Sequence, residues 1–214
     1  MSLNNIKKEG DMLPTTTKIT KEMILNTAFE IAREKGFEKI SNRELAKKMN
    51  CSIRPIYYQF KNVEELNKEL YKKIERYFYE FLIDNMIKDV PLYKQIGINY
   101  IKFAIAENNL FKFLFMTEIK DEPSAFITTD EKGFEEVVKA IKISTKLSDK
   151  DIKSFHIKMW IFAHGIATLS ATKSVKFTDE QIQDLLSQEF QALMLLEENP
   201  NNKWILKNND EWKK

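Results

Sequence analysis

Apolar residues recur every three or four positions through most of the chain, which is the period of an α-helix with one buried face. The clearest early stretch covers residues 20–35, where Ile24, Ala28, Ile31 and Ala32 fall on one side. Glycine and proline number only five each, too few for the frequent turns that a β-sheet needs. The pattern predicts an all-α chain of about nine helices and no strand.

Later segments repeat the same period behind recognisable start signals. The longest covers residues 62–85, about 36 Å at the rise of an α-helix. Pro91 begins another helix, Ser148 a further one, and Thr178 with Gln181 forms a capping box for the last. Shorter helices are expected at residues 110–116 and 134–141, on either side of a loop at residues 120–128.

A short helix is predicted from Ser41, because Glu44 three residues later can complete a capping box with it. This helix would bury Leu45 and Met49, which lie four residues apart. Asn50 stands at its end, where the chain must adopt a left-handed conformation that asparagine tolerates.

A second short helix follows almost at once. Ser52 is placed to cap it, and Pro55 falls in its first turn, where the missing N–H costs little. Ile56 and Phe60 face inward, four residues apart. Two short helices joined by so tight a turn form a helix-turn-helix, with which many proteins read DNA.

The order and spacing of these residues resemble the tetracycline-repressor-like (TetR/AcrR) family of transcriptional regulators. The resemblance rests on the helix at residues 20–35 with Gly36 and Phe37, on Ser41, Leu45 and Ala46, on Ser52, Ile56, Tyr57 and Phe60, and on Asn62, Glu64 and Leu66. Three positions depart from the family pattern: Asn50 replaces a usual glycine, Ile53 a small residue, and Val63 a lysine that often touches phosphate. Lys61 is expected to supply the phosphate contact that Val63 cannot make.

The resemblance implies that the helix after Ser52 enters the major groove. Arg54 is the expected base contact, because a guanidinium can bond both acceptors of guanine, with a plain phosphate contact as the alternative. Tyr58 is expected on phosphate or a thymine methyl, Gln59 on adenine or the DNA backbone, and Tyr57 to be partly structural. The implied DNA contacts are Lys21, Ser41, Asn42, Arg43, Ser52, Ile53, Arg54, Pro55, Tyr57, Tyr58, Gln59 and Lys61.

One phosphate is expected at the start of the first short helix. Backbone N–H groups and the helix dipole converge there, beside Ser41 and Arg43. The alternative for Arg43 is an ion pair with Glu44 or Glu38.

Charge is unevenly distributed along the chain. The net charge is +2, but the first 61 residues hold 12 Lys and Arg against 7 Asp and Glu, or +5, which leaves −3 for the rest. A basic head on a mildly acidic body suits a DNA-reading domain joined to a regulatory one, although a solvated lysine surface would look the same. We expect a disordered tail at 1–17, the helix-turn-helix domain at 18–64, a helical ligand-sensing and dimerisation domain at 65–198, and a tail at 199–214.

Phenylalanine and tyrosine are abundant between residues 77 and 116. The resemblance implies a pocket for a small apolar ligand among these helices, although any single ring taken alone is better explained as core. The expected pocket residues are Tyr77, Phe81, Tyr100, Phe103, Phe111, Phe115, Met116, Phe155 and Met159.

Residues 159–171 are apolar almost all round, which predicts a helix covered on every side and hence a partner subunit. Trp160, His164 and Gly165 resemble a motif in the dimerisation helix of one branch of the family. His164 could respond to pH or ligand, or could be a hydrogen-bonded core histidine. The expected dimer interface comprises Trp160, Ala163, His164, Ala167, Ile182, Leu186, Phe190 and Leu193.

Other classes of protein find little support. Cys51 is the one cysteine, so an intrachain disulfide is impossible and a reducing compartment is expected, with Cys51 a small core residue rather than a redox sensor. The longest uncharged run, 14 residues, is too short to span a membrane, and the amino terminus lacks an apolar signal core. No phosphate loop, nucleophile elbow or metal-spaced His and Cys set is present, so we expect a cytoplasmic protein with no cofactor, metal or enzymatic activity.

Together these features predict a homodimeric repressor that binds a palindromic DNA operator and is released by a small apolar effector. The alternative is a DNA-binding regulator of the same fold controlled by a protein partner instead of a small ligand.

Overall fold

The computed structural model describes residues 18–84, 86–87, 89–117 and 132–198, and all regular structure within them is helical. The helices are α1 (Lys21–Lys35), the short 3-10 helix η1 (Phe37–Lys39), α2 (Asn42–Lys48), α3 (Arg54–Gln59), α4 (Val63–Ile83), α5 (Leu92–Ala106), α6 (Asn108–Phe115), α7 (Lys132–Ser144), α8 (Asp149–Ala171) and α9 (Asp179–Glu198). The all-α prediction is confirmed for these residues. The predicted tails at 1–17 and 199–214 and the loop at 120–128 lie outside them.

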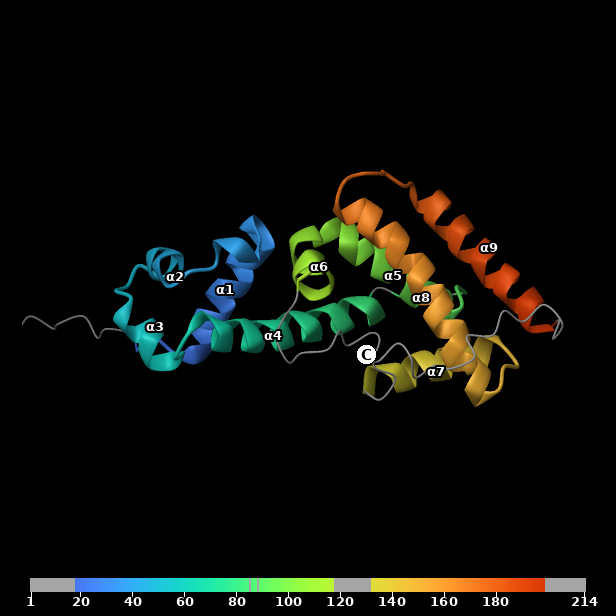
Figure 1. Ribbon diagram of the computed structural model, residues 1–214, viewed down its shortest axis with the longest axis horizontal. Helices are drawn as coiled ribbons and strands as arrows, with labels where there is room; N and C mark the ends of the chain where they lie inside the picture. Colours follow the sequence, from blue (N-terminus) through green and yellow to red (C-terminus); the bar gives the residue numbers. More distant parts are fainter. Residues whose placement is uncertain (1–17, 85, 88, 118–131, 199–214) are drawn as a thin grey trace, which may run out of the picture.

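The helices form a small head and a larger body joined by one rod. α1, α2 and α3 make the head, and α4 runs from it along the underside of α5 and α6 (Figure 1). α4 packs against α1 near its start and against α5 and α6 further on. Its 21 residues span about 32 Å, so one helix connects the two parts.

The head closes around the predicted apolar positions. Ile24, Ala28 and Ile31 of α1 are fully buried, and Leu45 of α2 and Ile56 of α3 meet them with at most 1% exposure. Met49, predicted to be buried, packs only partly against this core because it ends α2.

Local hydrogen bonds explain where the head helices begin. Ser41 Oγ accepts from the Glu44 N–H at 3.2 Å, as predicted, but the Glu44 carboxylate binds Lys35 Nζ at 2.6 Å instead of returning to Ser41. Half of the expected capping box therefore forms. Asn50 has φ of 50°, which confirms the left-handed conformation predicted for the turn.

The prediction that Ser52 caps α3 is wrong. Ile53 is the N-cap residue and no side chain caps this helix. Ile53 already has helical dihedral angles, so Ser52 lies one residue too early for its hydroxyl to serve the free N–H groups of α3. Pro55 lies in the first turn, as expected.

Polar side chains fix both ends of α4. Asn62 Oδ1 accepts from the Glu65 N–H at 2.8 Å and caps its start. At its end, Asn99 of α5 donates to the carbonyls of Leu82 and Asp84 at 2.9 and 3.1 Å, and Gln95 donates to Asn99 Oδ1 at 3.1 Å. Asn99 and Gln95 are buried, so the end of the rod is held by interior hydrogen bonds to α5.

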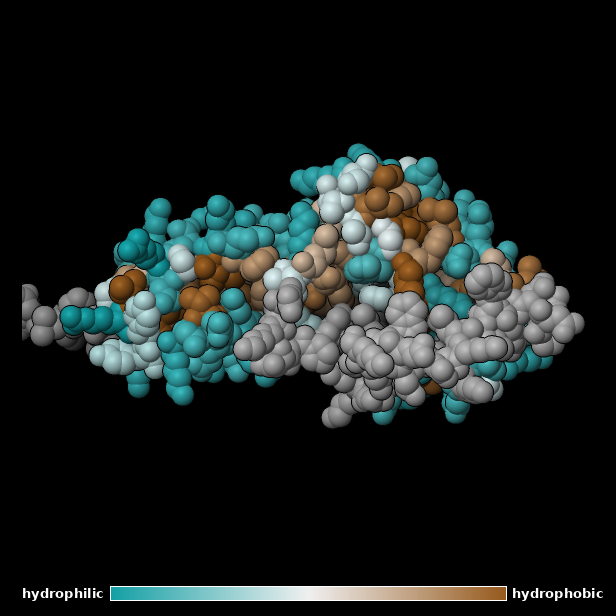
Figure 2. Space-filling view, viewed as in Figure 1, coloured by the Kyte–Doolittle hydropathy of each residue, from teal (hydrophilic) through white to brown (hydrophobic). Residues whose placement is uncertain are grey.

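α5 is the central helix of the body and packs against α4, α6, α7, α8 and α9. The outer face of α8 and α9 remains apolar: Ile161, Leu169 and Leu195 are 51%, 42% and 67% exposed. Brown, apolar side chains gather over these two helices in Figure 2. The sequence predicts that α8 is covered on every side. Within a single chain, the other helices cover only one side of it.

Candidate nucleic-acid interface and inner cavity

The outer face of α3 carries large side chains in water. Tyr57 and Tyr58 are 55% and 84% exposed, Ile53 is 42% exposed, and Arg54 is exposed beside them. Ile56 and Phe60 hold the opposite face in the head core. α3 therefore presents aromatic, aliphatic and cationic groups on one accessible surface.

Two arginines near this surface are free to meet a ligand. Within the part of the chain that the structure describes, neither Arg43 nor Arg54 has an acidic partner. Glu44, the expected alternative partner of Arg43, is bound to Lys35. Ser41 and Asn42 stand with Arg43 at the first turn of α2, and Lys61 is exposed just after α3. Cations without internal partners can neutralise phosphates without first breaking a bond.

Two other predicted DNA contacts have partners inside the head. Gln59 Nε2 donates to the Ile19 carbonyl at 3.4 Å and ties the end of α3 to the chain before α1. Lys21 Nζ lies 5.1 Å from the centroid of the Phe60 ring and 3.8 Å from Glu69 Oε2. Both side chains brace the head in this arrangement.

Comparison with known proteins identifies this head. Residues 24–70 match the sequence profile described as "Bacterial regulatory proteins, tetR family". Residues 24–70 are therefore a DNA-binding head of the TetR type. No curated protein sequence matches the chain.

Solved structures extend the TetR likeness to the whole fold. A TetR family protein from Vibrio parahaemolyticus has 18% sequence identity and a TM-score of 0.61, with 80% of this chain and 97% of that one covered. A TetR-like transcriptional regulator from Rhodococcus sp. RHA1 has 15% identity and a TM-score of 0.57, with 86% and 98% covered. Thermus thermophilus FadR, a TetR family transcriptional repressor in complex with lauroyl-CoA, has 13% identity and a TM-score of 0.52, with 81% and 92% covered.

The body of the chain contains a cavity of about 620 Å³. Its walls come from α5, α7, α8, α9 and the segment before α5, and they are mainly apolar, with Ile96, Met159 and Phe190 among them. The size lies within the range of small-molecule sites in proteins.

Only part of the predicted pocket lines this cavity. Tyr100 and Met159 do; the other predicted residues are Tyr77, Phe81, Phe103, Phe111, Phe115, Met116 and Phe155, and they do not. Phe103 and Phe111 are fully buried in a cluster of edge-to-face rings, with 5.0 Å between the Phe78 and Phe103 centroids. Phe103 and Phe111 are therefore core residues in this structure, which was the alternative to a pocket.

Several residues predicted for the dimer interface are used within the chain. Ala163, Ala167, Ile182, Leu186 and Leu193 are buried because α8 and α9 turn these positions toward each other and α5. Trp160, Ala163, Leu186 and Phe190 line the cavity. The large apolar residues left exposed on the described part of α8 and α9 are Ile161, Leu169, Leu195 and Leu196, which the prediction did not include.

Two tyrosine–histidine pairs join α5 to α8. Tyr93 Oη lies 3.1 Å from His156 Nδ1, and Tyr100 Oη lies 2.8 Å from His164 Nδ1. Burial lowers the pKa of His156 from 6.5 to about 4 and also lowers the pKa of His164. Burial raises the pKa of both tyrosines, so the four rings are uncharged near neutral pH. His164 is thus a partly buried, hydrogen-bonded histidine, and the centroid of the Trp160 ring stacked on it lies 4.9 Å away.

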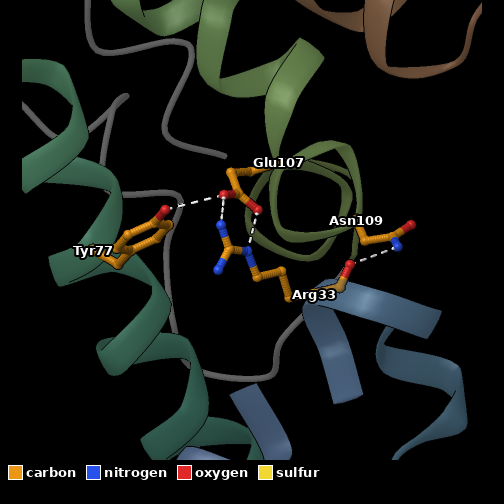
Figure 3. A network of polar contacts seen from close by, with 4 residues as sticks. All are labelled: Arg33, Tyr77, Glu107 and Asn109. Atoms are coloured by element: carbon orange, nitrogen blue, oxygen red, sulfur yellow. Dashed lines mark hydrogen bonds and ion pairs between the residues drawn. The ribbon is translucent and has the colours of Figure 1, made fainter. Parts of the chain in front are cut away.

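A second polar group connects the head to the body (Figure 3). Glu107, which is 6% exposed, accepts from Arg33 Nε at 2.8 Å and also from its terminal NH₂ group. Tyr77 Oη donates to the same carboxylate at 3.0 Å, and Asn109 Nδ2 donates to the Arg33 carbonyl at 2.9 Å. The hydrogen bond from Arg33 to Glu107 raises the pKa of Arg33. Burial, and then the separate hydrogen bond from Tyr77 to Glu107, raise the pKa of Tyr77. We call Arg33, Tyr77, Glu107 and Asn109 the Glu107 network.

The sequence predicted only Tyr100 and Met159 of the cavity walls as pocket residues, and it did not predict the Glu107 network. Tyr93 and His156 lie 63 residues apart along the chain, and Arg33 and Glu107 lie 74 apart. No local sequence pattern can therefore pair them. Among the described residues there is no group of three or more His, Cys, Asp or Glu that could hold a metal ion. No helix in the described ranges is both long and apolar enough to cross a membrane.

Proposed function

We propose that this chain is a transcriptional repressor that binds an inverted-repeat DNA operator as a homodimer and is released by a small apolar effector. The observation that carries the proposal is the TetR head, whose α3 exposes Arg54, Tyr57 and Tyr58 on the side away from the core. Such a repressor would act in the cytoplasm, where a bacterial chromosome lies, and would need no catalytic group.

Direct reading of bases by α3 is supported by its side chains. Arg54 can donate two hydrogen bonds to guanine, while the exposed side chains of Lys61, just after α3, and Arg43, in the first turn of α2, can meet phosphates. Because the Gln59 amide is bound to Ile19, we assign base reading to Arg54 and the exposed Ile53 and Tyr58 rather than to Gln59.

Control by a small molecule is supported by the cavity of about 620 Å³ in the body. The Thermus thermophilus repressor of the same fold is in complex with lauroyl-CoA, a ligand with a long apolar chain. A largely apolar hollow of this size favours a small effector over a protein partner, which would need an outer surface.

The test is selection of duplexes from a randomised pool, followed by binding measurements on the selected sequence and a scrambled one. We expect an inverted repeat, bound as a dimer, with at least 100-fold preference over the scrambled duplex at moderate salt. A monomeric protein that enriches no sequence would refute the proposal.

A further inference from the structure

We propose that Ile53 and Tyr57 form an apolar contact for the 5-methyl group of thymine, so that each half-site of the operator carries a thymine close to the guanine that Arg54 bonds. The inference rests on the proposed function and adds the second base that α3 recognises. It follows from which side chains α3 exposes and which hydrogen-bonding groups it lacks.

Ile53 and Tyr57 lie on the same side of α3. The Ile53 carbonyl accepts a hydrogen bond from the Tyr57 N–H at 3.4 Å, so the two residues are one helical turn apart and their side chains are neighbours. Ile53 is 42% exposed and Tyr57 is 55% exposed, whereas Ile56 of the same helix is buried in the head. α3 itself lies at the end of the head that is far from the body (Figure 1). We call Ile53 and Tyr57 the apolar edge of α3.

The other side chains of α3 offer few ways to recognise a base by hydrogen bonds. Arg54 is the one charged residue of the helix, and its guanidinium is suited to guanine. Gln59, whose amide could pair with adenine, is partly buried and donates to the Ile19 carbonyl. The helix contains no carboxylate that could accept from cytosine. Apart from the hydroxyls of its two tyrosines, α3 therefore has apolar surface left for the remaining bases.

Positive charge beside the apolar edge makes duplex DNA its occupant. Between Glu44 and Glu64 the chain has no acidic residue and four Lys and Arg residues. Arg54 directly follows Ile53, and Lys61 is exposed just after α3. An apolar edge in such a cationic surface suits a polyanion that also presents apolar groups.

Thymine is the base that fits this edge. Its 5-methyl group is the apolar group that a base pair presents in the major groove, and covering a group of this size tightens binding about fourfold. The Cα atoms of the consecutive residues Ile53 and Arg54 are about 3.8 Å apart, and stacked base pairs are about 3.4 Å apart. The thymine should therefore lie within about two base pairs of the guanine.

The experiment replaces thymine by deoxyuridine in the duplex selected from the randomised pool. Deoxyuridine still pairs with adenine and keeps the O4 acceptor, but it lacks the 5-methyl group. Each thymine is replaced in turn, together with its symmetric copy in the other half-site, and binding is measured by fluorescence anisotropy. We expect one such replacement, within about two base pairs of the position that Arg54→Ala affects, to weaken binding about tenfold, because two methyl groups are lost.

Variants assign the methyl contact to the apolar edge. With Ile53→Ala the same replacement should cost less than about twofold, whereas Ile53→Val, which keeps a branched side chain, should retain most of the loss. Tyr57→Phe should keep the dependence on the methyl group because the ring remains, and Tyr57→Ala should reduce it. Val63→Ala, at a 38% exposed position in the first turn of α4, is the matched control and should show the full loss. Circular dichroism shows whether each variant is folded.

Three results would overturn the inference while leaving the regulator intact. They are a selected half-site without thymine in those positions, deoxyuridine replacements that each change affinity less than about twofold, and a loss that Ile53→Ala does not reduce. Failure of the native chain to select any inverted repeat would instead overturn the proposed function.

Discussion

Arg54 stands apart from the other cations of the head because it lies in the first turn of the exposed helix α3 and has no acidic partner among the described residues. The Arg54→Ala variant should lose about 1–3 kcal/mol on the selected duplex and relax preference at one base pair. Binding isotherms on the selected duplex and on single-base variants measure this loss. Equal losses on the selected and scrambled duplexes would contradict base reading.

Lys61 provides the contrasting case. Its exposed ammonium group is assigned to phosphate, so Lys61→Ala should weaken all sequences alike and reduce the salt dependence of binding. Titrations at three salt concentrations on both duplexes would reveal the change of slope. A loss of affinity on the selected duplex alone would indicate that Lys61 contacts bases and not phosphate.

His156 should make stability fall as the pH is lowered. The unfolded chain takes up a proton there near pH 6.5, whereas burial holds the pKa in the folded chain at about 4. Its stabilising contribution is complete above pH 6.5 and is lost as the pH falls from 6.5 to 4, by about 2 kcal/mol between pH 7 and 5. Urea unfolding at pH 7, 6 and 5 tests this against His156→Gln, which should lack that part of the slope.

The sequence predicts the starts of the helices better than any other feature of the fold. Asn62, Ser148 and Thr178 each cap the helix for which they were expected, because a cap needs only neighbours three residues away. Ser52 failed because the turn carries helical geometry back to Ile53, which no side-chain pattern reveals. The cavity could not be predicted, since the pairing of Tyr93 with His156 depends on how α5 and α8 pack.

The Glu107 network links α1 and α4 to the junction of α5 and α6 through one carboxylate. Arg33→Met would leave that buried carboxylate without its main partner. It should cost about 1–3 kcal/mol, between the values for exposed and fully buried pairs, because Arg33 is half exposed. The Glu107→Gln variant removes the negative charge of the same pair. Chemical unfolding of both single variants and the double variant forms a thermodynamic cycle, and the double variant should lose less than the sum. Additive losses would show that the two residues do not act together.

For the whole molecule, the open apolar face of α8 and α9 is the natural place for a second subunit. Ile161 and Leu169 are half exposed, and a Cβ atom added at Gly165 between them would meet nothing within 4 Å in the same chain. Ile161→Asp should therefore yield a folded monomer that no longer binds an inverted repeat tightly. Sedimentation and circular dichroism measure these two properties.

The control for that experiment is Ile83→Asp, which places the same charge on a 64% exposed residue of α4. It should leave the sedimentation coefficient unchanged. If both variants remain dimeric, the subunits must meet elsewhere.

The Glu107 carboxylate also defines a mechanical centre. Arg33 reaches it from the end of α1 nearest the body, while α3 lies at the far end of the head (Figures 1 and 3). A rotation of the head about this pivot would leave Arg33 almost in place and carry α3 through the longest arc. In the proposed dimer, a tilt of a few degrees at each of these contacts would therefore change the distance between the two α3 helices.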